Sequence, residues 1–93
     1  MIFNTFMDIA IEEAKKAGAR GEVPIGAVVI DDRGKIISRD GNRTIELNDP
    51  TAHAEILVIR KACSILKNQR INGCSLYVTL EPCPMCAAAI SNA

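Results

Sequence analysis

The sequence predicts a small α/β domain in which helices pack on a mixed β-sheet. The chain has 93 residues, 48% of them hydrophobic, which suits one compact core and is too short for two domains. Apolar residues recur at helical spacing in some segments and cluster in short runs between them. A helical segment separates the second and third predicted strands. This connection is a crossover, so we expect the third strand to run parallel to a neighbour.

The first part of the chain predicts a helix followed by a β-hairpin. Residues 3 to 17 place phenylalanine, methionine and alanine side chains on one helical face, and Gly18 is expected to end this helix. Residues 23 to 30 are apolar and end in three β-branched residues, as in a strand covered on both faces. The Asp-Asp-Arg-Gly sequence at 31–34 is typical of a turn, so residues 35 to 39 should return as the second strand.

The second part of the chain predicts a loop, a helix, a strand and a last helix. Residues 40 to 48 are polar and should form the loop. The Asp-Pro-Thr sequence at 49–51 predicts a helix start, with the aspartate or the threonine as its cap, and the helix should end near residue 68. Residues 75 to 80 predict a strand. The Pro-Cys-Pro sequence at 82–84 then opens an alanine-rich helix.

Composition limits the classes of function. The 11 basic and 11 acidic residues cancel, so no overall charge points to nucleic acid, although a local basic stripe would not show in that total. Only three aromatic residues are present, too few for a platform that stacks several bases. No apolar run reaches the length of a membrane span, and the acidic residues near the N-terminus argue against a signal peptide. We expect a cytoplasmic protein with no membrane partner.

One histidine and one Cys-x-x-Cys pair are the most informative residues: His53, Cys83 and Cys86. Imidazole and thiolate groups are good zinc ligands. A structural zinc site normally has four protein ligands, whereas a catalytic site has three and leaves a position for water. Glu55 is not needed as a ligand and could move the protons of that water. The sequence therefore predicts a hydrolytic enzyme that binds one Zn²⁺ per chain.

The predicted elements place these residues at the beginnings of two helices, which we expect to converge on one point. Cys83 and Cys86 are three residues apart, so both sulfurs can reach one ion, and a helix N-terminus favours the thiolate that binds metal. Two other interpretations are open. His53 could be a helix-terminal histidine with a backbone partner, and the cysteines could be a redox pair. The prolines beside the cysteines argue against the redox pair.

With these residues placed, the chain resembles the cytidine deaminase-like superfamily, and within it the bacterial tRNA-specific adenosine deaminases. The zinc motif is common to the superfamily, while the Val-Pro-Ile-Gly-Ala-Val and Tyr-Val-Thr-Leu-Glu-Pro-Cys sequences favour the tRNA enzymes. The likeness runs from about Phe6 to the end. The segments that carry it are residues 22–28, 42–43, 49–55 and 76–86.

The resemblance implies a three-layer α/β/α fold with a mixed sheet, and conversion of adenosine to inosine at the wobble position of a tRNA anticodon loop. The histidine and both cysteines of the motif would hold zinc, and Glu55 would carry protons between water and the adenine ring. Asn42 would hydrogen-bond the flipped base. The backbone at Ala54 and the apolar side chain of Ile25 would line the pocket. The family enzyme is a homodimer, which we expect here too.

Family members continue well beyond residue 93. We therefore expect residues 1 to 93 to be the N-terminal part of a single zinc-dependent deaminase domain that is incomplete at its C-terminus. By itself, such a chain should deaminate tRNA poorly or not at all.

Two rival functions are open. The first is a related deaminase acting on a free base or nucleoside, such as guanine or cytosine, because guanine deaminases share the Asp-Pro before the histidine motif and the Pro-Cys-Pro-Met-Cys segment. The second is a non-catalytic remnant stabilised by zinc. The presence of Glu55 argues against the second, since a purely structural zinc site needs no general base.

Overall fold

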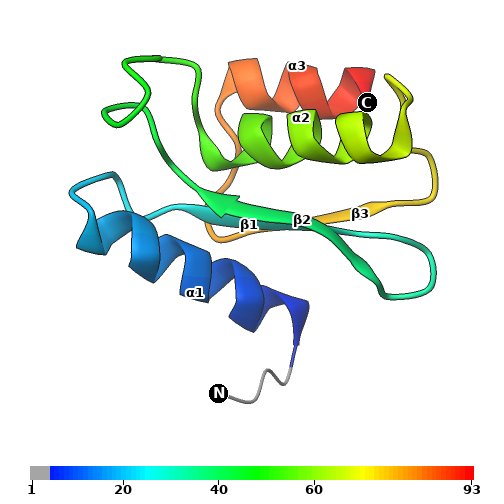
Figure 1. Ribbon diagram of the computed structural model, residues 1–93, viewed down its shortest axis with the longest axis horizontal. Coiled ribbons are helices and arrows are strands. Elements are labelled where there is room, and N and C mark those ends of the chain that lie inside the picture. The colour runs from blue at the N-terminus through cyan, green and yellow to red at the C-terminus, as the bar shows by residue number, and fades with distance from the viewer. Residues whose placement is uncertain (1–4) are drawn as a thin grey trace.

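The structure is a computed structural model that describes residues 5 to 93. A three-stranded sheet lies between two helical layers (Figure 1). The first helix, α1, covers one face of the sheet, while α2 covers the other face and has α3 beside it. The α/β class and the three layers are thus confirmed. The elements in chain order are α1 Phe6–Ala19, β1 Gly26–Ile30, β2 Ile36–Gly41, α2 Ala54–Leu66, β3 Ser75–Val78 and α3 Pro84–Asn92.

The strand order is β2-β1-β3, with β1 antiparallel to both of its neighbours. The expectation that the third strand runs parallel to a neighbour is therefore wrong, and the strands described here form an antiparallel sheet rather than a mixed one. The crossover does join two parallel strands, because β2 and β3 both run opposite to β1. They lie on either side of β1, however, and do not touch. The sequence predicted the crossover but not the strand that lies between its ends.

Helix α1 begins with a capping box. Thr5 Oγ1 accepts a hydrogen bond from the Asp8 amide at 3.2 Å, and Asp8 Oδ2 accepts one from the Thr5 amide at 3.2 Å. Residues 3 and 4, where the predicted helix began, lie outside the described residues. The helix does not end at Gly18 but continues to Ala19, and the residue with positive φ is Gly21, at 88°.

Two glycines let α1 lie directly on the sheet. A Cβ at Gly26 would collide with the backbone of Ala10 and Ala14, and one at Gly41 would lie 2.6 Å from the carbonyl oxygen of Glu13. Only glycine fits such close contact between a helix and strands. This contact sets where β1 begins, and therefore the position of Ile25, the predicted pocket residue that comes directly before the strand.

The hairpin turn forms as predicted. Asp31 Oδ1 accepts hydrogen bonds from the amides of Arg33 and Lys35 at 2.9 and 2.8 Å, and Gly34 has a φ of 81°. The second strand then runs further than expected, to Gly41. Asp40 therefore belongs to the strand and is buried rather than exposed in a loop. The first strand, by contrast, is shorter at its beginning than predicted.

Helix α2 does not begin at residues 49 to 51. Asp49 Oδ1 instead accepts hydrogen bonds from the amide and the hydroxyl of Thr51, at 2.8 and 2.7 Å, which makes a local turn. The helix begins at Ala54, and the extended residue before it, His53, is the N-cap. Helix α3 begins within the predicted Pro-Cys-Pro sequence, at Pro84, with Cys83 as its N-cap.

The core has two parts, one on each side of β1, all five residues of which are buried. Val28 and Ile30 pack against α1, whereas Ala27 and Val29 pack against α2 beside Val58. The apolar run in the sequence thus covers both faces of the central strand, as predicted. Among residues 5 to 93, no helix has the length and apolar character needed to cross a membrane.

Candidate metal centre

Two helix N-termini meet at one cluster of donor atoms. His53 caps α2, Cys83 caps α3, and Cys86 lies in the first turn of α3. His53 Nδ1 lies 3.7 Å from the Sγ of Cys83 and 3.4 Å from the Sγ of Cys86, and the three donor atoms lie within 4.8 Å of one another. The predicted convergence is confirmed. The histidine ring faces two sulfurs, whereas the alternative of a helix-terminal histidine required a backbone partner.

The spacing of these donors fits a tetrahedral ion. Zinc bonds sulfur at about 2.3 Å and nitrogen at about 2.0 Å, so two such donors on a tetrahedral ion lie about 3.6 Å apart. The observed separations of 3.4 and 3.7 Å agree with this value. Two thiolates and a neutral imidazole also balance the charge of a divalent cation. The residues present therefore fit zinc and leave a fourth position for water or substrate.

The two thiols have different environments. The backbone amide of Cys86 lowers the pKa of Cys83, against the opposing effect of burial. Burial raises the pKa of Cys86 to about 12, and both the hydrogen bond with Cys83 and the charge of Glu55 act in the same direction. The expected effect of the helix N-terminus is therefore seen for Cys83 alone. A divalent cation in contact with both sulfurs would reverse the preference at Cys86, because a metal ligates the thiolate form.

Glu55 lies in the first turn of α2, is 3% exposed, and contacts the same cluster. A hydrogen bond with this carboxylate, together with its charge, helps to raise the pKa of Cys86. Its Oε1 atom is buried and has no hydrogen-bond partner among the described residues. A buried carboxylate oxygen is costly without a partner, so such an atom points to a position for an absent ligand.

The three predicted pocket residues are joined by hydrogen bonds. Asn42 is 5% exposed; its backbone amide donates to the carbonyl of Ile25 at 3.1 Å, and its Oδ1 accepts from the amide of Ala54 at 2.8 Å. Ala54 lies between the histidine and the glutamate in the sequence. The structure therefore brings Asn42, Ala54 and Ile25 to the metal centre, while their roles in substrate binding stay predictions.

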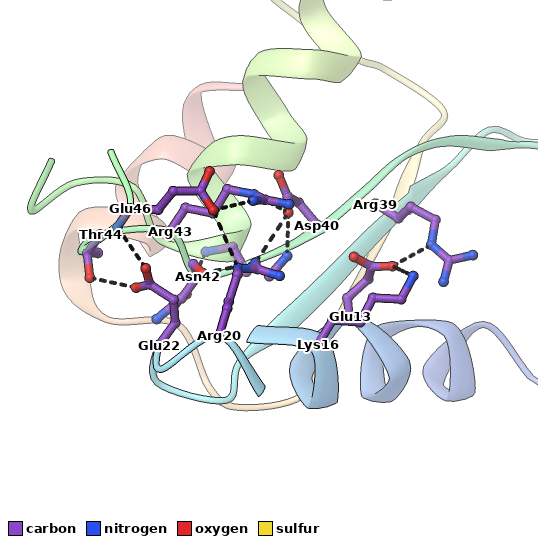
Figure 2. Close-up of polar contacts among 12 residues, drawn as sticks. Glu13, Lys16, Arg20, Glu22, Arg39, Asp40, Asn42, Arg43, Thr44 and Glu46 are labelled. Carbon is purple, nitrogen blue, oxygen red and sulfur yellow. Dashed lines mark hydrogen bonds and ion pairs between the residues drawn. The ribbon is translucent and has the colours of Figure 1, made fainter. Parts of the chain in front are cut away.

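Two residues that hold segments next to the candidate site, Glu22 and Thr79, were not singled out from the sequence, where they stand only within longer motifs. Thr79 joins the end of β3 to the start of β1: its amide donates to the carbonyl of Gly26 at 3.1 Å, and its hydroxyl accepts from the amide of Gly26 at 3.2 Å. The chain then passes to the cysteines. Glu22 binds the loop after β2 (Figure 2). The partners of both residues are distant in sequence, so no local pattern could reveal them.

A cavity of about 310 Å³ lies elsewhere, between β3 and the later parts of α2 and α3. Its lining includes Ile59, Ile71, Leu76 and Ile90 and none of the donor residues. Because the converging polar groups lie at the metal centre, the chemistry is expected there and not in this cavity.

Comparison with known families agrees with the geometry. Residues 3–93 match the family described as "Cytidine and deoxycytidylate deaminase zinc-binding region". The chain belongs to this family. The family binds zinc, and His53, Cys83 and Cys86 are close enough to hold the ion.

Several relatives in this deaminase family are similar over most of the chain. The tRNA-specific adenosine deaminase of Agrobacterium fabrum (strain C58 / ATCC 33970) is 65% identical over 86 residues, which cover 92% of this chain and 56% of that protein. The protein of the same description from Aquifex aeolicus (strain VF5) is 52% identical over 85 residues, covering 91% and 56%. This chain thus spans a little over half the length of these relatives.

Solved structures share the fold. A structure from studies of A-to-I editing by tRNA:A34 deaminases at the wobble position of transfer RNA superimposes with a TM-score of 0.90 at 64% identity, covering 94% of this chain and 62% of that one. A guanine deaminase from Bacillus subtilis superimposes with a TM-score of 0.89 at 43% identity, covering 98% and 58%. Both similarities include the segment that holds the donor residues.

Proposed function

We propose that this chain carries the catalytic site of a zinc-dependent hydrolase that converts adenosine to inosine at the wobble position of a tRNA anticodon. One observation carries the hydrolytic part. A buried glutamate with an unpartnered oxygen lies beside three metal donors rather than four. The identities of 65% and 52% to tRNA-specific adenosine deaminases support adenosine in tRNA as the substrate. The match over residues 3–93 supports a single deaminase unit.

In this proposal, His53, Cys83 and Cys86 would hold zinc, which would supply Lewis acidity toward the water that attacks C6 of adenine. Glu55 takes a proton from the water and delivers it to the ring, and a further proton reaches the leaving amino group through the same carboxylate. Water and adenosine are consumed, and inosine and ammonia are formed. The unpartnered Oε1 of Glu55 is the atom available for these transfers.

Pocket residues would orient the base. The amide of Ala54 can only donate a hydrogen bond, so it holds Oδ1 of Asn42 and leaves Nδ2 of that side chain as a donor for the base. Ile25, partly buried beside this pair, would supply an apolar wall. Because the base must leave its stack to reach such a site, an anticodon loop is a suitable substrate.

We also propose that the protein works as a homodimer in the cytoplasm. The family resemblance supports the dimer, and so do large apolar side chains on the surface. Ile45 and Leu80 are 68% and 60% exposed, which a partner subunit would cover. Sedimentation of the zinc-loaded protein measures this directly: a monomer at micromolar concentration would contradict the dimer.

Guanine deamination is the second candidate, because the Bacillus subtilis guanine deaminase is 43% identical and superimposes over 98% of this chain. The two functions differ in substrate and share the zinc chemistry. Ammonia release from free guanine, with no inosine formed in an anticodon stem-loop, would favour the second candidate.

The test is inosine formation in an anticodon stem-loop by the zinc-loaded protein at its natural length, with Glu55→Gln as the variant. This change keeps the shape of the side chain but removes the base, so we expect a loss of turnover of at least about 100-fold with zinc retained. Glu12→Gln is the matched control, since Glu12 lies on α1, across the sheet from α2. Full turnover by Glu55→Gln would refute the proposed role, and zinc loss in that variant would make Glu55 a ligand instead.

A further inference from the structure

One buried carboxylate holds the loop that follows β2. Glu22 is 5% exposed. Its Oε1 accepts hydrogen bonds from the amide of Ile45 at 3.1 Å and the hydroxyl of Thr44 at 3.2 Å, and its Oε2 accepts one from the amide of Glu46 at 2.9 Å (Figure 2). Three successive residues thus donate to one carboxylate, and two of the donors are backbone amides. Such charge-assisted bonds are stronger than neutral ones, so they restrict the loop.

The backbone around Glu22 is itself held in place by hydrogen bonds. Glu22 follows α1, and its backbone amide donates to the carbonyl of Ala17 in that helix at 3.0 Å. In the same segment between α1 and β1, Arg20 Nη2 donates to the backbone carbonyl of Asn42 at 3.1 Å. Burial alone would raise the pKa of Glu22, but the amides of Glu46 and Ile45 outweigh it and lower this pKa. The side chain is therefore ionised at neutral pH and anchored to the helical layer.

The loop begins at Asn42, which is fixed on its other side by the candidate site. Its amide donates to Ile25, and its side-chain oxygen accepts from Ala54 at the start of α2. The orientation of the Asn42 side chain therefore depends on two supports. One is α2, and the other is the loop that the carboxylate of Glu22 holds two residues further along.

We propose that Glu22 is a positioning residue, which holds residues 44 to 46 and through them keeps Asn42 in the orientation that a substrate base requires. This inference rests on the proposed function, because that function gives Asn42 the role of binding the base. The metal donors and Glu55 lie at the starts of α2 and α3, outside this loop. Glu22 should therefore affect the binding of substrate more than the chemical step.

Glu22→Gln tests this with little change of shape. One carboxylate oxygen becomes an NH₂ group that faces a donor of the loop, so at least one hydrogen bond to a charged acceptor is lost. We expect KM for an anticodon stem-loop to rise about tenfold or more, with kcat within about threefold of wild type and zinc content unchanged. Asp32→Asn is the control. It makes the same charge change at an exposed side chain in the hairpin turn, away from this loop, and should shift KM by less than about threefold.

A double-mutant cycle separates positioning from simple stabilisation. If Glu22 acts through Asn42, then Glu22→Gln should raise KM by less than about threefold once Asn42→Ala is present. A full additional tenfold rise in that background would overturn the proposal. So would a loss confined to kcat, or an equal rise of KM in Asp32→Asn.

Amide hydrogen exchange gives a readout that does not need activity. In Glu22→Gln, exchange at Ile45 and Glu46 should become at least about tenfold faster, while exchange at Val58 in α2 should be unchanged. Unchanged exchange at Ile45 and Glu46 would overturn the inference, whatever the activity. Faster exchange in a protein whose wild type forms no inosine would leave the loop contact correct and would refute the proposed function instead.

Discussion

Replacing Asp40 with asparagine should strongly destabilise the protein, because this carboxylate joins three parts of the fold. Its side chain is 3% exposed. Oδ1 accepts hydrogen bonds from Arg43 Nε at 2.9 Å and from the amide of Gly41 at 2.8 Å, while Oδ2 accepts from Lys61 Nζ of α2 at 2.9 Å. Arg20 Nη2, at the end of α1, lies 3.8 Å from Oδ1. The residue thus links both helical layers to β2.

The size of this stability loss depends on which hydrogen bonds the asparagine side chain can still make. Asparagine can accept from Gly41 and Arg43 through its oxygen, but its NH₂ group would face the ammonium of Lys61, so that contact becomes donor against donor. Loss of a hydrogen bond to a charged group costs about 1.5–3 kcal/mol. Removing one partner of a fully buried ion pair costs about 3–5 kcal/mol, but Lys61 and Arg43 are 52% and 30% exposed and can turn to water. We expect about 1.5–3 kcal/mol.

Urea denaturation of the zinc-loaded protein, followed by circular dichroism, measures this loss. For a domain of this size the loss corresponds to a fall in Tm of about 6–24 °C. Asp32→Asn is the matched control, since that aspartate lies exposed in the hairpin turn and should change the free energy of unfolding by less than about 0.5 kcal/mol. An equally small change for Asp40→Asn would show that the contacts of this carboxylate do not stabilise the fold.

The stability difference between wild type and Asp40→Asn should depend on pH. Burial alone would raise the pKa of Asp40, but the hydrogen bonds from Lys61, Gly41 and Arg43 outweigh it and hold this pKa below 3.8. A lowered carboxyl pKa contributes stability above the unfolded-state value, and that stability is lost as pH falls through the folded-state value. The difference between wild type and Asp40→Asn should therefore be constant from about pH 5 to 7 and shrink below about pH 3.8. A difference that shrinks near pH 6 would point to another group.

Two further predictions concern the contacts that place the site. Gly26→Ala should cost at least about 1–3 kcal/mol or prevent folding, because its Cβ would collide with the backbone of α1. Gly18→Ala is the control: it lies in the helix, and its Cβ would meet only the Cβ of Pro24 at 3.4 Å, so it should be neutral or stabilising by up to about 1 kcal/mol. Equal stabilities of the two variants in urea would contradict this. Thr79→Val should lower zinc affinity, measured by competition with a chelator. The variant lacks the hydroxyl that accepts from the Gly26 amide and so holds the segment leading to the cysteines. Unchanged affinity would show that Thr79 does not position the cysteines.

The local features of this molecule could be predicted from its sequence. The apolar run at 28–30 indicated a strand covered on both faces. Side chains alternate along a strand, and here a helix packs on each face of the sheet. The cluster of candidate metal donors was predicted because the types and spacing of its residues are those that zinc sites use. His53, Cys83 and Cys86 indeed lie within 4.8 Å of one another in the structure.

The features that were not predicted depend on partners distant in sequence or on competition for one group. Asp49 was a good helix cap by type, but its carboxylate binds Thr51 and the helix begins five residues later at Ala54. The position of β1 between β2 and β3 is a property of the whole sheet. Likewise, Glu22 finds its donors more than twenty residues away, where no periodicity could indicate them.

X-ray absorption at the zinc edge of the purified protein tests whether the zinc site has three protein ligands and one position open to water. We expect about one zinc per chain, bonded to two sulfurs at about 2.3 Å and to two lighter atoms, the histidine nitrogen and a water oxygen, at about 2.0 Å, with the zinc lost in His53→Ala. A zinc bound by three or four sulfurs, or a protein that folds and retains no zinc, would contradict this expectation.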